Sequence, residues 1–135
     1  MRRGFIPPSE LADYAQSGSR LGGHPSHTLP GVEFSTGSLG HGLSLGIGLA
    51  LAARHLGRRN RTFVLMGDGE LQEGSVWEAA GSARRFDLGA LTAIVDRNGL
   101  QINGAVESWL PAGSLAQRWA SFGWDVIECD GHGLA

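Results

Sequence analysis

Asp68 and Asn98 are the residues best suited to chemistry, because each follows an apolar run that reads as a buried strand. These runs are residues 62–66 and 91–95. In an open parallel sheet, ligands bind beyond the carboxyl ends of the strands. Neighbouring strands lie about 4.8 Å apart, so a carboxylate on one strand end and an amide oxygen on the next can reach one cation. Oxygen ligands with a single carboxylate suit magnesium or calcium, and magnesium completes its octahedron with phosphate oxygens and water.

Glycines on either side of Asp68 extend this pattern. Gly67 and Gly69 would let the backbone turn sharply and approach a phosphate, whose charge is favoured at the start of the helix that follows. Taken singly, Gly67-Asp68-Gly69 and Asn98-Gly99 are also common turn sequences. Their combination, with a helix and a buried strand between them, favours a shared site for a cation and a phosphate.

The elements that would position these residues alternate between helix and strand. Strands without apolar-polar alternation are typical of a parallel sheet that is covered on both faces. The pattern therefore predicts an α/β fold, a partial doubly wound parallel sheet with helices on both faces, formed by one domain over residues 1–135 without an internal boundary. The expected elements are a short helix at 9–15, a long loop at 21–36, helices at 38–56, 75–85 and 115–122, and strands at 62–66, 91–95 and 124–128.

Composition narrows the classes of function. The net charge is -2 and the acids and bases are interspersed, so we expect no nucleic-acid partner. All eleven cationic residues are arginine, which excludes P-loop and Schiff-base chemistry that would begin with a lysine of this stretch. The single cysteine, Cys129, excludes an internal disulfide and suits a cytoplasmic protein. No apolar run follows the first arginines, so we expect neither a signal peptide nor a membrane anchor.

Two motif alternatives are weaker. Gly42-Leu43-Ser44-Leu45-Gly46 satisfies the pattern of a hydrolase nucleophile elbow, but that motif needs a strand before it and a polar, glycine-rich loop precedes it here. A dinucleotide fold needs a third glycine where Gln72 stands. His24 and His27 form a His-x-x-His pair without an evident third ligand, so a zinc site is not expected.

Several segments together resemble one family. The segments GDGELQEG, WEAA and DRNGLQ, at residues 67–74, 77–80 and 96–101, resemble the N-terminal, diphosphate-binding part of transketolases. The closer resemblance is to the split type, in which the N-terminal and C-terminal halves are separate polypeptides. Further similarity covers residues 22–26, 29–33, 36–40 and 130–132, and so nearly the whole chain.

The resemblance implies a cofactor, thiamine diphosphate with Mg²⁺. The side chains of Asp68 and Asn98 and the backbone carbonyl of Leu100 would be the metal ligands. Gly69 would contact the diphosphate, with Gly67 beside it. This assignment agrees with the cation site expected from the strand ends.

Other positions would serve the rest of the cofactor and the substrate. Gly37 and Leu39 are similar to residues that line the pyrimidine and thiazolium region. His24 matches a histidine that hydrogen-bonds the sugar substrate, although a loop histidine bonded to nearby backbone is the ordinary alternative. We expect His27 to be structural.

The implied activity is the transfer of a two-carbon ketol unit from a ketose to an aldose, with phosphorylated sugars expected, as in the pentose phosphate pathway. The family requires a glutamate from a pyrimidine-binding domain, which we expect on a C-terminal transketolase subunit in a dimer or larger homo- or hetero-oligomer. This sequence lacks the pyrimidine-binding domain and parts of a full N-terminal subunit. We therefore expect the chain to be a fragment of such an enzyme. Alternatives are an inactive cofactor-binding fragment and a thiamine diphosphate enzyme with a different donor.

Overall fold

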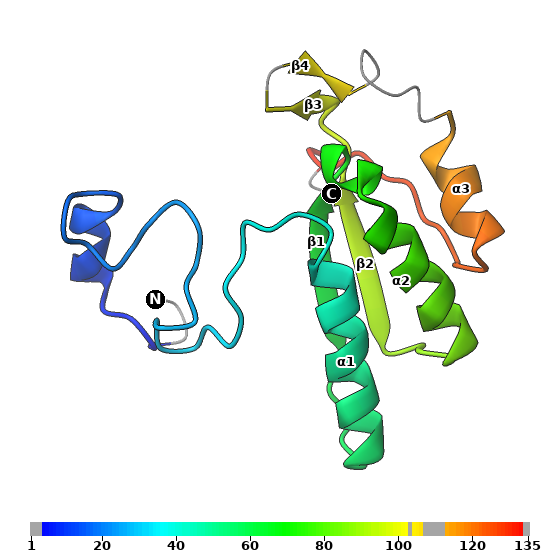
Figure 1. The fold of residues 1–135 in the computed structure, drawn as a ribbon, viewed down its shortest axis with the longest axis horizontal. Coiled ribbons are helices and arrows are strands. Elements are labelled where there is room, and N and C mark those ends of the chain that lie inside the picture. The colour runs from blue at the N-terminus through cyan, green and yellow to red at the C-terminus, as the bar shows by residue number, and fades with distance from the viewer. Residues whose placement is uncertain (1–3, 103, 107–112, 134–135) are drawn as a thin grey trace. The chain divides into compact units, whose positions relative to one another are not determined.

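The structure is a computed structural model that describes residues 4–102, 104–106 and 113–133. The chain divides into two compact units, Met1–Leu39 and Gly40–Ala135 (Figure 1). That the two form one domain without an internal boundary stays a prediction. Within the part of the chain that is described, no helix has the length and apolar character that a membrane crossing needs.

The first unit contains one short 3₁₀ helix, η1 (Pro8–Asp13), where the sequence predicts a helix at 9–15. The helix ends at Asp13 because Tyr14 has an extended ψ of 128°, and Ala15 then adopts a left-handed conformation, with φ at 57°. The Arg20 guanidinium bonds both oxygens of the Glu10 carboxylate, at 2.7 and 2.6 Å, and this contact lowers the pKa of Glu10 below its usual value. Residues 21–36 form neither helix nor strand, as predicted.

The second unit is built on a parallel pair of strands, β1 (Thr62–Gly67) and β2 (Leu91–Asp96). The register pairs the first residues of the two strands with each other, and it likewise pairs Gly67 with Asp96 at their carboxyl ends. The predicted strands and the α/β class are confirmed. Beyond β2, a small antiparallel ladder joins β3 (Leu100–Gln101) to β4 (Gly104–Ala105), where the sequence predicts only a turn.

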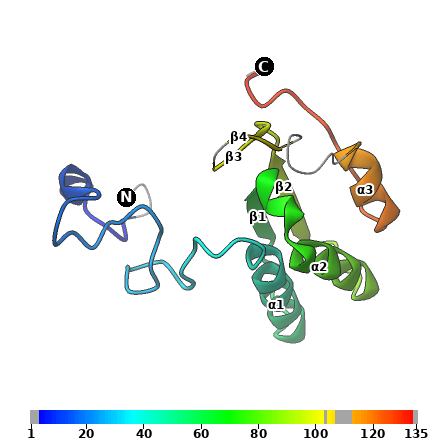
Figure 2. The same cartoon turned by 45° about the horizontal axis from the view of Figure 1, so that its top comes forward.

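Two helices, α1 (Gly42–His55) and α2 (Gly74–Arg85), lie against the same face of this sheet (Figures 1 and 2). Helix α1 begins later than the predicted residue 38 because Gly40 has φ at 81° and cannot continue a right-handed helix. Its first turn includes the Gly-x-Ser-x-Gly motif, which therefore forms no strand-turn-helix elbow. The buried core between the helices and the sheet includes Leu43, Ile47, Val64, Met66, Val76, Ala80 and Leu91.

Helices were predicted on both faces of the sheet, but the face opposite α1 and α2 is exposed. Phe63, Leu65 and Ile94 point away from the core and are 58%, 72% and 46% exposed. Because successive strand residues alternate between faces, β1 is buried on one side only. The helices described in this unit cover one face of the sheet.

A third helix, α3 (Leu115–Ser121), packs on α2 through aromatic side chains. Ser114 caps the start of this helix, since its hydroxyl accepts a hydrogen bond from the Gln117 backbone N–H at 3.2 Å. The predicted strand at 124–128 is wrong, since this segment pairs with no strand. The Trp124 indole instead donates to the Ala80 carbonyl of α2 at 3.1 Å, which holds the segment on the helical layer and away from the sheet.

The close approach of α1 to the sheet depends on Gly46. A Cβ atom there would lie 2.5 Å from Val64 Cγ2, whereas a Cβ at Gly48 on the same helix would meet nothing within 4 Å. We expect Gly46→Ala to lower the free energy of unfolding by about 1 to 3 kcal/mol through overpacking. Gly48→Ala should raise it by up to about 1 kcal/mol through helix propensity. Urea unfolding measures both, and equal effects of the two substitutions would contradict this packing.

Candidate metal and cofactor site

Asp68 occupies the carboxyl edge of the sheet, directly after β1. Its backbone N–H donates to the Asp96 carbonyl at the end of β2, at 3.1 Å. Its carboxylate Oδ2 accepts a hydrogen bond from the Gly99 N–H at 2.9 Å. The side chain therefore bridges the two strand ends, and it brings Asp68 next to the turn that holds Asn98.

The second carboxylate oxygen of Asp68 has no hydrogen-bond partner among the described residues. Asp68 is 5% exposed, and its Oδ1 is fully buried. Buried polar atoms in folded proteins are almost always paired, and an unpaired one calls for an explanation. A cation bound at Oδ1 is such an explanation, so the residues present fit the predicted metal.

Asn98 is exposed at the end of β2 and is held by hydrogen bonds from both sides. Its Oδ1 accepts from the Leu100 N–H at 2.8 Å, and its Nδ2 donates to Asp96 Oδ2 at 3.1 Å. An amide oxygen has two lone pairs, so Oδ1 keeps capacity for another contact. The predicted carbonyl ligand, Leu100, begins β3 two residues further on.

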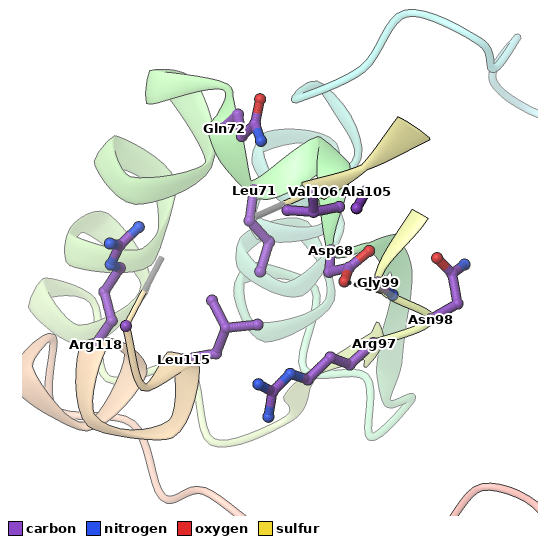
Figure 3. A pocket seen from close by; sticks show the side chains of 11 residues that line it. Asp68, Leu71, Gln72, Arg97, Asn98, Gly99, Ala105, Val106, Leu115 and Arg118 are labelled. Carbon is purple, nitrogen blue, oxygen red and sulfur yellow. Dashed lines mark hydrogen bonds between the residues drawn. The ribbon is translucent and has the colours of Figure 1, made fainter. Parts of the chain in front are cut away.

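A cavity of about 300 Å³ adjoins this edge (Figure 3). Asp68, Asn98 and Gly99 line it, together with apolar side chains that include Leu71 and Leu115. Two cationic residues also line it, namely Arg97 beside Asn98 and Arg118 on α3. Neither arginine was among the residues predicted for the site. The position of Arg97 next to Asn98 was a usable signal, whereas nothing in the sequence around Arg118 points to the cavity.

The turn after Asp68 contains a short element that the sequence did not predict, the 3₁₀ helix η2 (Gly69–Gln72). Helix α2 follows at Gly74, within one residue of its predicted start at 75. A Cβ at Gly69 would lie 2.8 Å from Gln101 Cβ, so glycine lets η2 pack against β3. A Cβ at Gly67 would meet nothing within 4 Å, which leaves this backbone open to a ligand.

Gly40 is hydrogen-bonded to the same turn, a contact for which its neighbouring residues carry no signal. Its N–H donates to Glu70 Oε1 at 2.8 Å, and its carbonyl accepts from the Ser75 hydroxyl at 3.0 Å. A Cβ at Gly40 would lie 2.5 Å from Ser75 Oγ and 2.7 Å from Glu73 Cβ. Thus η2 and the first turn of α2 hold Gly40, which lies two residues before the start of α1.

The predicted substrate and thiazolium residues lie in the first unit. The His24 ring packs on Gly37, where a Cβ would approach the ring carbon Cγ to 2.9 Å. Leu39 ends this unit and is half exposed. His27 Nδ1 contacts the Ser35 hydroxyl at 2.9 Å, in keeping with the expected structural role.

No set of three or more His, Cys, Asp or Glu side chains is placed to hold a metal in the described part of the chain. An ion at the sheet edge would therefore depend on Asp68 together with amide and carbonyl oxygens. This donor set suits a hard cation such as Mg²⁺.

Comparison with known proteins assigns the family. The model of the transketolase thiamine diphosphate binding domain matches residues 5–135. The chain belongs to the transketolase family. The thiamine diphosphate prediction is thereby confirmed, and Mg²⁺ accompanies this cofactor in transketolases.

Individual transketolases share this region at substantial identity. The chain is 47% identical over 129 residues to an apulose-4-phosphate transketolase subunit of Phocaeicola vulgatus, covering 96% of this chain and 46% of that protein. It is 46% identical to the subunit of the same name from Actinobacillus succinogenes, covering 97% and 48%. Transketolase from Leishmania mexicana has a similar structure, with a TM-score of 0.82 at 36% identity, covering 90% and 20% of the two chains. The chain thus spans about half the length of the two bacterial proteins that it matches.

The contacts around Gly40 give a prediction about stability. Gly40→Ala and Gly57→Ala both place alanine at a positive φ, which costs roughly 1 to 2 kcal/mol. A Cβ at Gly57 meets nothing within 4 Å, whereas one at Gly40 collides with Ser75 and Glu73. We expect Gly40→Ala to lose roughly 1 to 3 kcal/mol more than Gly57→Ala, because of overpacking. Thermal unfolding of both variants measures the difference, and equal losses would mean that the Gly40 contacts are absent in solution.

Proposed function

We propose that this chain binds the diphosphate of thiamine diphosphate through Mg²⁺ and forms the N-terminal part of a transketolase. Asp68 Oδ1, Asn98 Oδ1 and the Leu100 carbonyl would be the protein ligands of the ion. The observation that carries the proposal is the buried, unpartnered Oδ1 of Asp68 at the edge of the sheet. Its partner oxygen is already bonded to Gly99, so the carboxylate is held in one orientation.

Three oxygen ligands from the protein match the coordination that Mg²⁺ prefers. The ion usually takes one or two carboxylates and completes an octahedron with phosphate oxygens and water. A single carboxylate leaves the bound ion with net positive charge, which favours a diphosphate as the remaining ligand. The open backbone at Gly67 and the turn at Gly69 would border the diphosphate. Arg97 and Arg118 add positive charge to the adjoining cavity.

When bound, thiamine diphosphate supplies the nucleophilic carbon and the electron sink that permit cleavage of a ketose and transfer of a two-carbon ketol unit. The protein residues bind and orient. In this proposal His24 hydrogen-bonds a sugar hydroxyl, while Gly37 and Leu39 line the pyrimidine and thiazolium region. The packing of His24 on Gly37 supports a common role for these two residues.

We further propose a C-terminal partner subunit that carries the pyrimidine-binding domain, in an oligomeric, cytoplasmic enzyme of carbohydrate metabolism. Two relatives similar to this chain are named as one subunit of a transketolase, a name that implies a second subunit in those enzymes. The donor and acceptor would be a ketose and an aldose, with phosphorylated sugars as the first to assay.

Asp68→Asn is the sharpest test of the metal site. The substitution keeps an oxygen that can accept the Gly99 N–H but removes the negative charge. We expect the affinity for thiamine diphosphate in the presence of Mg²⁺ to fall by about 100-fold or more, because the ion loses the one anionic ligand among the three proposed. Isothermal titration calorimetry measures this affinity.

Asp125→Asn is the matched control, since it makes the same charge change at an exposed position. It should bind as the unmodified chain does. Equal affinity of the Asp68 and Asp125 variants would exclude Asp68 as a metal ligand. A chain that binds cofactor but supports no ketol transfer with any C-terminal transketolase subunit would favour the cofactor-binding fragment over the enzyme.

A further inference from the structure

The turn that begins with Asp68 accepts a hydrogen bond from a side chain of α2. Neither partner in this bond is one of the proposed metal ligands. Trp77 lies in the first turn of α2, and its indole Nε1 donates to the Leu71 carbonyl of η2 at 2.7 Å. The Leu71 N–H in turn donates to the Asp68 carbonyl at 3.2 Å. Two hydrogen bonds therefore connect the Trp77 indole to the backbone of the proposed metal ligand.

The Trp77 ring is fixed on its other sides by α3. Its centroid lies 5.2 Å from that of Trp119 and 5.5 Å from that of Phe122, with which it stacks. The Arg118 guanidinium carbon lies 5.1 Å from the ring centroid. These contacts are favourable aromatic and cation-π geometries, and they restrict rotation of the indole. Its N–H is thus preorganised toward Leu71.

The turn depends on contacts with neighbouring segments, because its own backbone geometry is weak, and the Trp77 bond is one of them, beside those of Glu70 with Gly40 and of Gly69 with Gln101. Helix η2 has four residues, no side-chain cap at its start and the weaker hydrogen-bond geometry of a 3₁₀ helix. The Leu71 side chain is 3% exposed, which anchors the side chain but leaves the backbone carbonyl in need of a donor. The indole is the donor that the structure provides.

We propose that Trp77 is a positioning residue for the metal site, which holds the turn after Asp68 in the geometry that binds Mg²⁺ through its hydrogen bond to Leu71. This inference rests on the proposed function for its consequence in binding. The effect of Trp77 on the conformation of the turn does not depend on a bound cofactor, so it can be measured in the cofactor-free chain.

Trp77→Phe removes the donor and keeps an aromatic ring, and Trp124→Phe is its matched control. Trp124 belongs to the same aromatic cluster, at 5.1 Å from Trp119, and its Nε1 donates to a backbone carbonyl at 3.1 Å. That carbonyl belongs to Ala80 within α2 and not to the turn. The two variants therefore lose similar contacts, and only one of them loses a contact to η2.

Hydrogen exchange of the cofactor-free chain gives the first readout. We expect the Leu71 and Glu73 amides to exchange about tenfold faster in Trp77→Phe than in Trp124→Phe, which corresponds to one lost hydrogen bond of ordinary net strength. Equal exchange in the two folded variants would overturn the proposal. If Trp77→Phe does not fold, hydrogen exchange of the Trp77 indole N–H in the unmodified chain tests the hydrogen bond instead. Exchange as fast as that of a solvent-exposed indole would refute the bond and the proposal.

Cofactor binding gives the second readout. The Mg²⁺ concentration for half-maximal binding of thiamine diphosphate should rise about five- to tenfold in Trp77→Phe and stay unchanged in Trp124→Phe. If Trp77 had a purely structural role, both variants would be less stable but would need the same Mg²⁺ concentration for half-maximal binding. That result would count against the proposal. If the unmodified chain binds no cofactor, the proposed function fails while hydrogen exchange still decides the role of Trp77.

Discussion

The bridge between Asp68 and Gly99 is the interaction on which the rest of the site depends. Parallel strands end at one edge of a sheet, and the pairing of Gly67 with Asp96 places the carboxyl ends of β1 and β2 side by side. The carboxylate of Asp68 then accepts the Gly99 N–H, which fixes the turn after β2 relative to β1. One carboxylate oxygen is used in this bond, and the other remains for a ligand.

This arrangement has an energetic cost that a bound cation would offset. A buried polar atom without a partner typically costs about 1 to 3 kcal/mol, and more if it is charged. Native proteins keep such features mainly where function needs them, and other parts of the fold compensate. In this chain the compensation includes close packing of α1 on the sheet at Gly46 and the aromatic cluster that joins α2 to α3. The aromatic cluster also contacts the turn after Asp68, through the hydrogen bond from the Trp77 indole to the Leu71 carbonyl.

The sequence was most informative where local pattern decides structure. Apolar runs predicted both central strands, and the polar residues that follow them predicted Asp68 and Asn98 as neighbours. The segment at 124–128 was also predicted as a strand but forms none, because the Trp124 indole binds α2 instead. Strand pairing depends on what lies beside a segment, and its own composition does not record this.

Contacts between distant residues were the features that sequence reasoning missed. Gly40 and Glu70 are bonded across 30 positions, and neither residue carries a local signal of that pairing. Arg118 reaches the cavity only because α3 packs on α2. Exposure of Phe63 and Leu65 was also missed, since both belong to an apolar run that gives no indication of which face is covered. Periodicity can identify an element, but its partners follow from the tertiary fold.

The central claim is that Asp68 and Asn98 bind the same divalent ion, and paramagnetic broadening by Mn²⁺ tests it most directly. With thiamine diphosphate present, Mn²⁺ substituted for Mg²⁺ should broaden the side-chain amide NMR signals of Asn98 in the unmodified chain. In the Asp68→Asn variant, the same Mn²⁺ concentration should leave these signals sharp. Sharp Asn98 signals in the unmodified chain at saturating Mn²⁺, or equal broadening in both proteins, would contradict the account.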